Sequence, residues 1–163
     1  MLIGVMADSH DNVPMVEAAV ELFNRAEVQH VLHAGDFVAP FAIDPLRQLA
    51  CPVLSVFGNN DGERIGLAAR IREVGAVHSH LATAVLADRR IAVVHYPELA
   101  EPLARSGSYD LVVYGHTHRV DQRHDNGLLL NPGETGGWLT GCATVAIVDL
   151  DNLHVRLHEL PAD

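Results

Sequence analysis

Seven side chains of the kinds that bind divalent metal ions lie in short polar blocks within the first 118 residues. They offer only carboxylate, amide and imidazole donors: Asp8, His10, Asp36, Asn59, His95, His116 and His118. Such donors suit Mn²⁺, Fe, Zn²⁺, Ni²⁺ or Mg²⁺ and differ from the thiolates of a structural zinc site. Seven donors are more than one ion needs if it keeps a position for a substrate. The set therefore predicts two ions that share one bridging carboxylate, an arrangement that stabilises both oxygens of an in-line displacement at phosphorus.

Each polar block ends or directly follows a short apolar run that reads as a buried strand. We expect these strands at Leu2–Ala7, His30–His33, Pro52–Val56, Ile91–His95 and Leu111–Tyr114. Ligand sites in α/β proteins form beyond the carboxyl ends of strands. Five loops at one edge would therefore bring their donors to one place.

Taken one at a time, the same blocks have ordinary structural explanations. Asp8-Ser9-His10 fits a turn before a helix, and Gly35-Asp36 and Asn59-Asn60-Asp61-Gly62 are common turn compositions. His116-Thr117-His118 alone is more often a loop than a metal site. Their joint occurrence after five strands favours the metal site.

The remaining segments complete a mixed α/β pattern. We expect helices from an Asn12 N-cap through Phe23, over Pro40–Ala50, over Gly66–Val74 with Gly75 as the C-terminal stop, and over Pro97–Arg105. Two hairpins are expected in the second half, pairing Val120–His124 with Leu128–Asn131 and Thr144–Leu150 with His154–Leu160. The pattern predicts one domain over residues 1–163, an α/β fold of two facing mixed sheets with helices on their outer sides.

Composition limits the function classes. The chain has a net charge of −10 and all 11 basic residues are Arg, which argues against a groove for duplex nucleic acid but not against a small phosphate ester. Cys51 and Cys142 are isolated and fit reduced thiols. The first residues lack a basic signal-peptide region, and no apolar run reaches the roughly 18 residues of a membrane span. We expect a cytoplasmic protein without membrane contact.

The five blocks resemble the calcineurin-like metallophosphoesterases, in particular their small bacterial and archaeal phosphodiesterase branch. The family pattern is D-x-H, G-D, G-N-x-D/E, a lone H and G-H-x-H, and the chain has these blocks in that order between Asp8 and His118. Asn131-Pro132-Gly133 also looks like this branch. The resemblance implies a four-layer α-β-β-α sandwich.

The resemblance also implies how the donors divide between two ions. The first ion would be held by Asp8, His10, Asp36 and His118, and the second by Asp36, Asn59, His95 and His116. Asp36 would bridge them, and a hydroxide between the ions would be the nucleophile. Mn²⁺ is the expected metal, with Ni²⁺, Fe, Zn²⁺ and Mg²⁺ as alternatives.

Three positions depart from the family pattern. Many relatives have a His after the metal-binding Asn, whereas this chain has Asn60, which can donate a hydrogen bond but cannot act as a general acid. Asn60 is the expected catalytic residue beyond the metal ligands. The lone His95 is followed by Tyr96 rather than Gly, and the N-P-G block continues with Glu134 rather than Ser.

Two further side chains are expected to support the ligands. His33 either orients a ligand from behind or is a buried strand histidine with a backbone partner. Asp61 either accepts a hydrogen bond from a metal-binding imidazole, which we favour, or caps its own turn.

The charge of the site favours diesters. Two divalent ions, two aspartates and a bridging hydroxide leave a net charge of about +1, which suits a singly charged phosphodiester. A monoester dianion usually needs an Arg or Lys clamp, and only Arg64 and Arg119 adjoin the blocks. The expected partner is thus a small phosphodiester.

The alternatives are a monoester phosphatase on the same site and a non-catalytic metal-binding scaffold, as in a retromer subunit that resembles this family. Exposed sheet edges are compatible with a homodimer.

Overall fold

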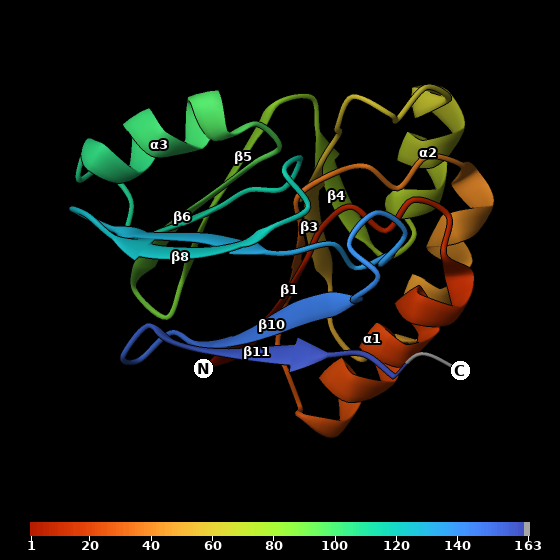
Figure 1. Ribbon diagram of the computed structural model, residues 1–163, viewed down its shortest axis with the longest axis horizontal. Coiled ribbons are helices and arrows are strands. Elements are labelled where there is room, and N and C mark those ends of the chain that lie inside the picture. The colour runs from red at the N-terminus through yellow and green to blue at the C-terminus, as the bar shows by residue number, and fades with distance from the viewer. Residues whose placement is uncertain (162–163) are drawn as a thin grey trace.

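The computed structural model describes residues 1–161 and contains two mixed β-sheets (Figure 1). The first sheet has the strand order β11 (His154–Glu159), β10 (Thr144–Asp149), β1 (Leu2–Met6), β2 (Val31–His33), β3 (Val53–Val56) and β4 (Gly75–His78). The second has the order β5 (Leu81–Leu86), β6 (Arg89–Val94), β7 (Leu111–Val113), β9 (Leu128–Pro132) and β8 (Val120–His124). Strands β1 to β4 are parallel in the first sheet, and β6, β7 and β9 are parallel in the second.

The period of two along each strand divides the apolar residues between two faces. In β6, Ile91 and Val93 face the space between the sheets, whereas Ala92 and Val94 pack on the outer side. Strand β7 does the same with Leu111 and Val113 inward and Val112 outward. A strand that is buried on both faces has a continuous apolar sequence, and β6 and β7 both contain such a run. The inward sets of the two sheets form one shared core.

Helices cover the outer face of each sheet. Helix α1 (Val13–Arg25), the 3₁₀ helix η1 (Pro40–Gln48) and helix α2 (Arg64–Ile71) pack on the first sheet. Helix α3 (Pro97–Arg105) packs on the second, at the opposite side of the molecule (Figure 1). The predicted four-layer α-β-β-α sandwich is therefore confirmed.

The segment after α2 was predicted wrongly. Residues 72–74 form a turn and Gly75 begins strand β4, so Gly75 is not the stop of a helix that runs to Val74. A Cβ atom at Gly75 would lie 1.9 Å from the Val53 carbonyl oxygen. Glycine is needed there because it lets β4 approach β3 closely.

Three helix predictions need smaller corrections. Asn12 makes no side-chain cap to α1; its amide instead donates to the Gly136 carbonyl at 2.7 Å. Helix α2 begins at Arg64, two residues before the predicted start, because the Glu63 side chain accepts from the Gly66 amide and caps it. The segment from Pro40 is a 3₁₀ rather than an α-helix and contains Pro45, which has no amide hydrogen for a helical bond.

This architecture collects the five predicted loops at one rim. Parallel strands β1, β2 and β3 end beside one another in the first sheet, and β6 and β7 do so in the second. The Ala34 carbonyl after β2 accepts from the ring of His95 after β6, which shows that the two rims meet. In residues 1–161 we find no helix with the length and apolar content to span a membrane.

Candidate metal centre

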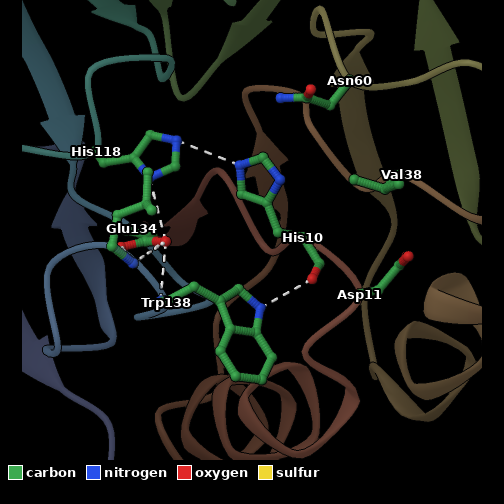
Figure 2. Close-up of a pocket in the computed structure, with 8 residues that line it drawn as sticks. His10, Asp11, Val38, Asn60, His118, Glu134 and Trp138 are labelled. Carbon is green, nitrogen blue, oxygen red and sulfur yellow. Dashed lines mark hydrogen bonds and ion pairs between the residues drawn. The ribbon is translucent and has the colours of Figure 1, made fainter.

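Four of the predicted ligands converge closely; we call Asp8, His10, Asp36 and His118 the inner group. One donor atom from each lies within 4.8 Å of all the others. His10 Nε2 is 3.2 Å from His118 Nε2 and 3.6 Å from Asp36 Oδ2, while His118 Nε2 is 3.8 Å from Asp8 Oδ1. Figure 2 shows the two imidazole rings with their Nε2 atoms pointing toward each other. Both carboxylates are fully buried.

The other three predicted ligands form an outer group, Asn59, His95 and His116. The Asn59 Oδ1 atom is 2.9 Å from both His95 Nε2 and His116 Nδ1. His95 Nε2 also lies 3.5 Å from Asp36 Oδ2. The same carboxylate oxygen is thus about equally distant from His10 of the inner group and from His95 of the outer group. That is the position a bridging ligand would need.

The protonation of His95 tests whether a cation fits. Its Nδ1 atom is 2.7 Å from the Ala34 carbonyl oxygen, which can only accept, so Nδ1 carries the proton. Burial is the main reason that the pKa of His95 is lowered, which favours the neutral ring. The lone pair of Nε2 then faces two oxygens that also hold lone pairs, those of Asn59 and Asp36. A divalent cation among these three atoms would satisfy all of them.

The inner carboxylates give a second test. Burial, followed by repulsion from Asp36, raises the pKa of Asp8 to about 8. Two buried carboxylates that repel each other favour a bound cation, which would stabilise the ionised form of Asp8. The chemistry of both groups therefore fits divalent metals.

The loops that carry these ligands adopt a rarely used backbone conformation. Five of the seven predicted ligands have positive φ values between 43° and 70°: Asp8, His10, Asp36, His116 and His118. Non-glycine residues seldom adopt this region, and clusters of such residues occur at functional sites. The surrounding hydrogen bonds must therefore hold the loops in place.

Two glycines allow the loops after β2 and β3 to touch. A Cβ atom at Gly58 would lie 2.1 Å from Asp36 Oδ1. Gly35 has a φ of +95°, and a Cβ there would lie 2.7 Å from the Gly58 amide nitrogen. The glycine that precedes each ligand in the G-D and G-N blocks thus leaves room for the Asp36 carboxylate and its loop.

Asp61 supports the centre in a different way from the one we favoured. Its buried carboxylate accepts backbone amides from Asp36, Val38 and Gly58 at 2.7–3.0 Å, and within residues 1–161 it has no hydrogen bond with an imidazole. These amides belong to the two loops that Gly35 and Gly58 bring together. Asp61 therefore ties the bridging loop to the Asn59 loop through the backbone.

His33 has a related role beneath the first two loops. Its Nδ1 accepts from the Gly35 amide at 3.1 Å, and its Nε2 is 3.2 Å from the Ser9 hydroxyl. The ring is fully buried and stacks on Phe37, and burial lowers its pKa to about 3. The backbone-partner alternative is observed, and the Ser9 contact links the ring to the loop that carries Asp8 and His10.

Asn60 contacts the shared carboxylate directly. Its amide nitrogen Nδ2 donates to Asp36 Oδ2 at 2.8 Å, and its backbone amide donates to Asp36 Oδ1 at 2.8 Å. The residue is exposed at the mouth of the centre. It can therefore reach both the centre and a molecule bound above it.

Glu134 is a supporting residue that the sequence did not reveal. Its buried carboxylate lies 3.2 Å from His118 Nδ1, at an ion-pair distance rather than in an aligned hydrogen bond. It also accepts the backbone amides of Trp138, Leu139 and Thr140. Burial acts to raise the pKa of Glu134, but bonds from Thr140 and Leu139 outweigh it and keep the pKa low. An ionised carboxylate behind a metal-binding His fixes its ring and tautomer.

A cavity of about 440 Å³ opens over the inner group. Figure 2 shows its lining, with Trp138 at one end, Asn60 at the other, and His10 and His118 between them. Among residues 1–161, no Arg side chain contributes to the lining. The cavity is large enough for a small organic phosphate and leads to the predicted ligands.

Comparisons with known proteins agree with this arrangement. The model of the calcineurin-like phosphoesterase superfamily domain matches residues 1–153. The chain is 37% identical to a phosphodiesterase of Methanocaldococcus jannaschii over 161 residues, which covers 96% of this chain and 97% of that protein. It is 31% identical to a probable metallophosphoesterase of Methanothermobacter thermautotrophicus over 146 residues, which covers 82% of this chain and 76% of that protein. A solved structure of an archaeal phosphodiesterase superposes with a TM-score of 0.92 at 35% identity and covers 98% of this chain and 100% of that one.

Proposed function

The chain belongs to the calcineurin-like phosphoesterase superfamily and is a phosphoric ester hydrolase, and we propose that it cleaves phosphodiesters with two divalent metal ions. The observation that carries this proposal is the position of Asp36 Oδ2, 3.6 Å from an inner imidazole and 3.5 Å from an outer one. A single carboxylate oxygen can serve two ions only from such a place. The likeness to a named phosphodiesterase over nearly the whole chain supports the choice of substrate class.

The inner group would hold one ion and the outer group, with Asp36, the other. Bound there, the ions would supply positive charge to the phosphate oxygens and lower the pKa of an attacking water. The chain would do the rest through its own residues. Ala34 keeps the His95 lone pair on Nε2, and Glu134 keeps Nε2 of His118 toward the inner group.

The cavity favours a diester over a monoester. A monoester dianion is usually bound by Arg or Lys, and no such side chain lines the described cavity. The Arg64 guanidinium is committed elsewhere, since it donates to the carbonyl oxygens of Asp61 and Gly58 at 2.9 Å. The leaving oxygen would be near Asn60, whose side-chain amide can donate a hydrogen bond to it but no proton.

Parallel assays test the proposal. Bis(4-nitrophenyl) phosphate and 4-nitrophenyl phosphate would be compared with the same protein in Mn²⁺, Ni²⁺, Zn²⁺ or Mg²⁺ and after chelation. We expect metal-dependent hydrolysis with a higher kcat/KM for the diester. A higher kcat/KM for the monoester would make the protein a monoesterase, and metal binding without turnover of either ester would support the scaffold alternative.

A further inference from the structure

An exposed aromatic side chain stands beside the metal centre but is not one of its predicted ligands. Trp138 has 64% of its surface exposed, and its neighbour Leu139 has 79% exposed. Both line the same cavity as His10 and His118. Large apolar side chains that remain in water at the mouth of a polar site are typical of a surface that binds a ligand.

The indole is held in a fixed orientation. Its Nε1 donates to the His10 carbonyl oxygen at 3.0 Å, and its backbone amide donates to Glu134 Oε1 at 2.9 Å. Two further bonds connect the loop of Trp138 to the loop that carries Asp8 and His10. The Gly136 amide donates to the Asp8 carbonyl, and the Asn12 side-chain amide donates to the Gly136 carbonyl. Figure 2 shows the indole at the foot of the cavity with His10 and His118 above it. The ring is therefore both exposed and rigid.

The cavity lining contains a third apolar residue, Val38, which has a strained backbone conformation. Val38 has a φ of 88°, which is rare for a β-branched residue, and the Asp61 carboxylate holds its amide at 2.8 Å. Its side chain lines the cavity together with Trp138 and Leu139. Figure 2 shows Val38 across the cavity from the indole, near Asn60, so apolar side chains line the cavity on both sides of His10.

We propose that Trp138, assisted by its neighbour Leu139, is a subsite that stacks on a planar aromatic ring carried by the phosphate ester. The inference rests on the proposed function, because the metal centre would hold the phosphate while the indole holds the ring. A flat, rigid indole favours a flat partner, and stacking of this kind tolerates many ring types. The ring is an aryl group or a nucleobase, and the lack of an Arg in the described wall argues against a second phosphate.

Binding of matched probes tests the subsite without turnover. Isothermal titration calorimetry on the Mn²⁺-loaded protein would compare phenylphosphonate with methylphosphonate, and adenosine 5′-monophosphate with ribose 5-phosphate. We expect the ring to tighten binding roughly tenfold in at least one pair, which would identify the ring as aryl or nucleobase. Trp138 is the only tryptophan of the chain, so the ring-bearing probe should also change the protein's tryptophan fluorescence.

Variants separate stacking from support of the loop. Trp138→Ala should abolish the preference for the ring-bearing probe, whereas Trp138→Phe keeps a flat ring without Nε1 and should retain most of it. Val85→Ala removes an exposed apolar side chain from β5 in the second sheet and should leave the preference for the ring-bearing probe unchanged. An equal preference in the wild type and Trp138→Ala, or equal losses in the Ala and Phe variants, would overturn the subsite.

The two proposals can fail separately. If ring-dependent binding is found but no phosphate ester is hydrolysed, the subsite stands and the proposed function fails. If diesters are hydrolysed with the same KM by wild type and Trp138→Ala for every ring-bearing substrate, the function stands and the subsite is wrong.

Discussion

The inner and outer groups are both built from loops after parallel strands, yet the fold holds them differently. In the inner group, Asp8 and Asp36 are fully buried, and Asp8 accepts the His116 amide at 2.9 Å. In the outer group only His95 is buried, while Asn59 is exposed and His116 is partly exposed. Buried, hydrogen-bonded ligands are positioned before a metal arrives, whereas exposed ones must be ordered by it.

This difference suggests a division of labour. The inner group would bind its ion more tightly, because less side-chain freedom is lost on binding. The outer group would bind a more exchangeable ion at the mouth of the cavity, close to Asn60. Asp36 belongs to both and couples them.

Removing the shared carboxylate should have the largest effect. Asp36→Ala should weaken both ions and lower kcat/KM by about a thousandfold or more, since neither site keeps its bridge. Metal content after dialysis, together with diester hydrolysis, measures this. Asp125→Ala in the exposed turn before β9 is the control. Two tightly held ions in Asp36→Ala would show that the groups are independent and that Asp36 is not the bridge.

A substitution of Glu134, which lies behind His118, should affect metal binding by the inner group and not by the outer group. Glu134→Gln should weaken the inner ion by roughly 10–100-fold, as expected for loss of a carboxylate that orients a metal-binding His. Calorimetric titration with Mn²⁺ should show one weakened site and one that is little changed. Glu159→Gln, an exposed carboxylate in β11, is the matched control. Loss of the outer ion instead would reverse the proposed difference between the groups.

The rim at which the predicted ligands gather could be predicted from the sequence, and so could the presence of His33 and Asp61 behind them, but the role of Glu134 could not. Asp8, Asp36 and His116 follow apolar strands, so the rule that sites form at the carboxyl ends of strands placed them correctly at one rim. Glu134 gave no such signal, because its role depends on a loop whose backbone amides turn back onto it. That conformation is a tertiary property, and no periodicity marks it.

The other wrong predictions concern residues whose types fit two different local structures. Asp61 was expected to accept from an imidazole or to cap its own turn, and its carboxylate instead accepts the amide of Gly58 in that turn together with those of Asp36 and Val38. Strand β4 was missed because Gly75 is as typical of a helix end as of a close strand contact. The apolar runs of β6 and β7 are short but uninterrupted and lie directly before polar blocks, which is why these strands were predicted well.

The stability of the chelated protein should depend on pH through Asp8. Folding raises the pKa of Asp8 to about 8, so between its unfolded value and pH 8 the folded state holds a proton that the unfolded state has lost. Stability must then fall as pH rises through this window. Folding lowers the pKa values of His33 and His95, which has the opposite effect but only below about pH 6.5.

The window from pH 6.5 to 8 therefore isolates the carboxylate. In EDTA we expect about 1–2 kcal/mol of stability to be lost across it, seen as a lower Tm at pH 8 by calorimetry. Saturating Mn²⁺ should remove most of this slope, because the cation takes the place of the proton. Asp8→Asn should also remove it, and an unchanged slope in that variant would assign the effect to other groups.

The smallest effect is expected from substitutions of Asn60. Its side-chain amide donates to Asp36 Oδ2, the oxygen that the inner and outer groups share. A His at this position could protonate a poor leaving group, whereas an amide cannot, and a good leaving group needs no proton. The wild type should therefore cleave aryl diesters much faster than alkyl diesters such as cyclic nucleotides. Asn60→His should recover a part of the about 10²–10⁴-fold that a general acid contributes to kcat/KM for the alkyl substrates, and should leave aryl substrates nearly unchanged, with metal saturating. Asn60→Ala serves as the control, since it removes the side-chain bond to Asp36 Oδ2 without adding an acid. If the His variant changes both substrate types equally, position 60 acts through the shared carboxylate and not on the leaving group.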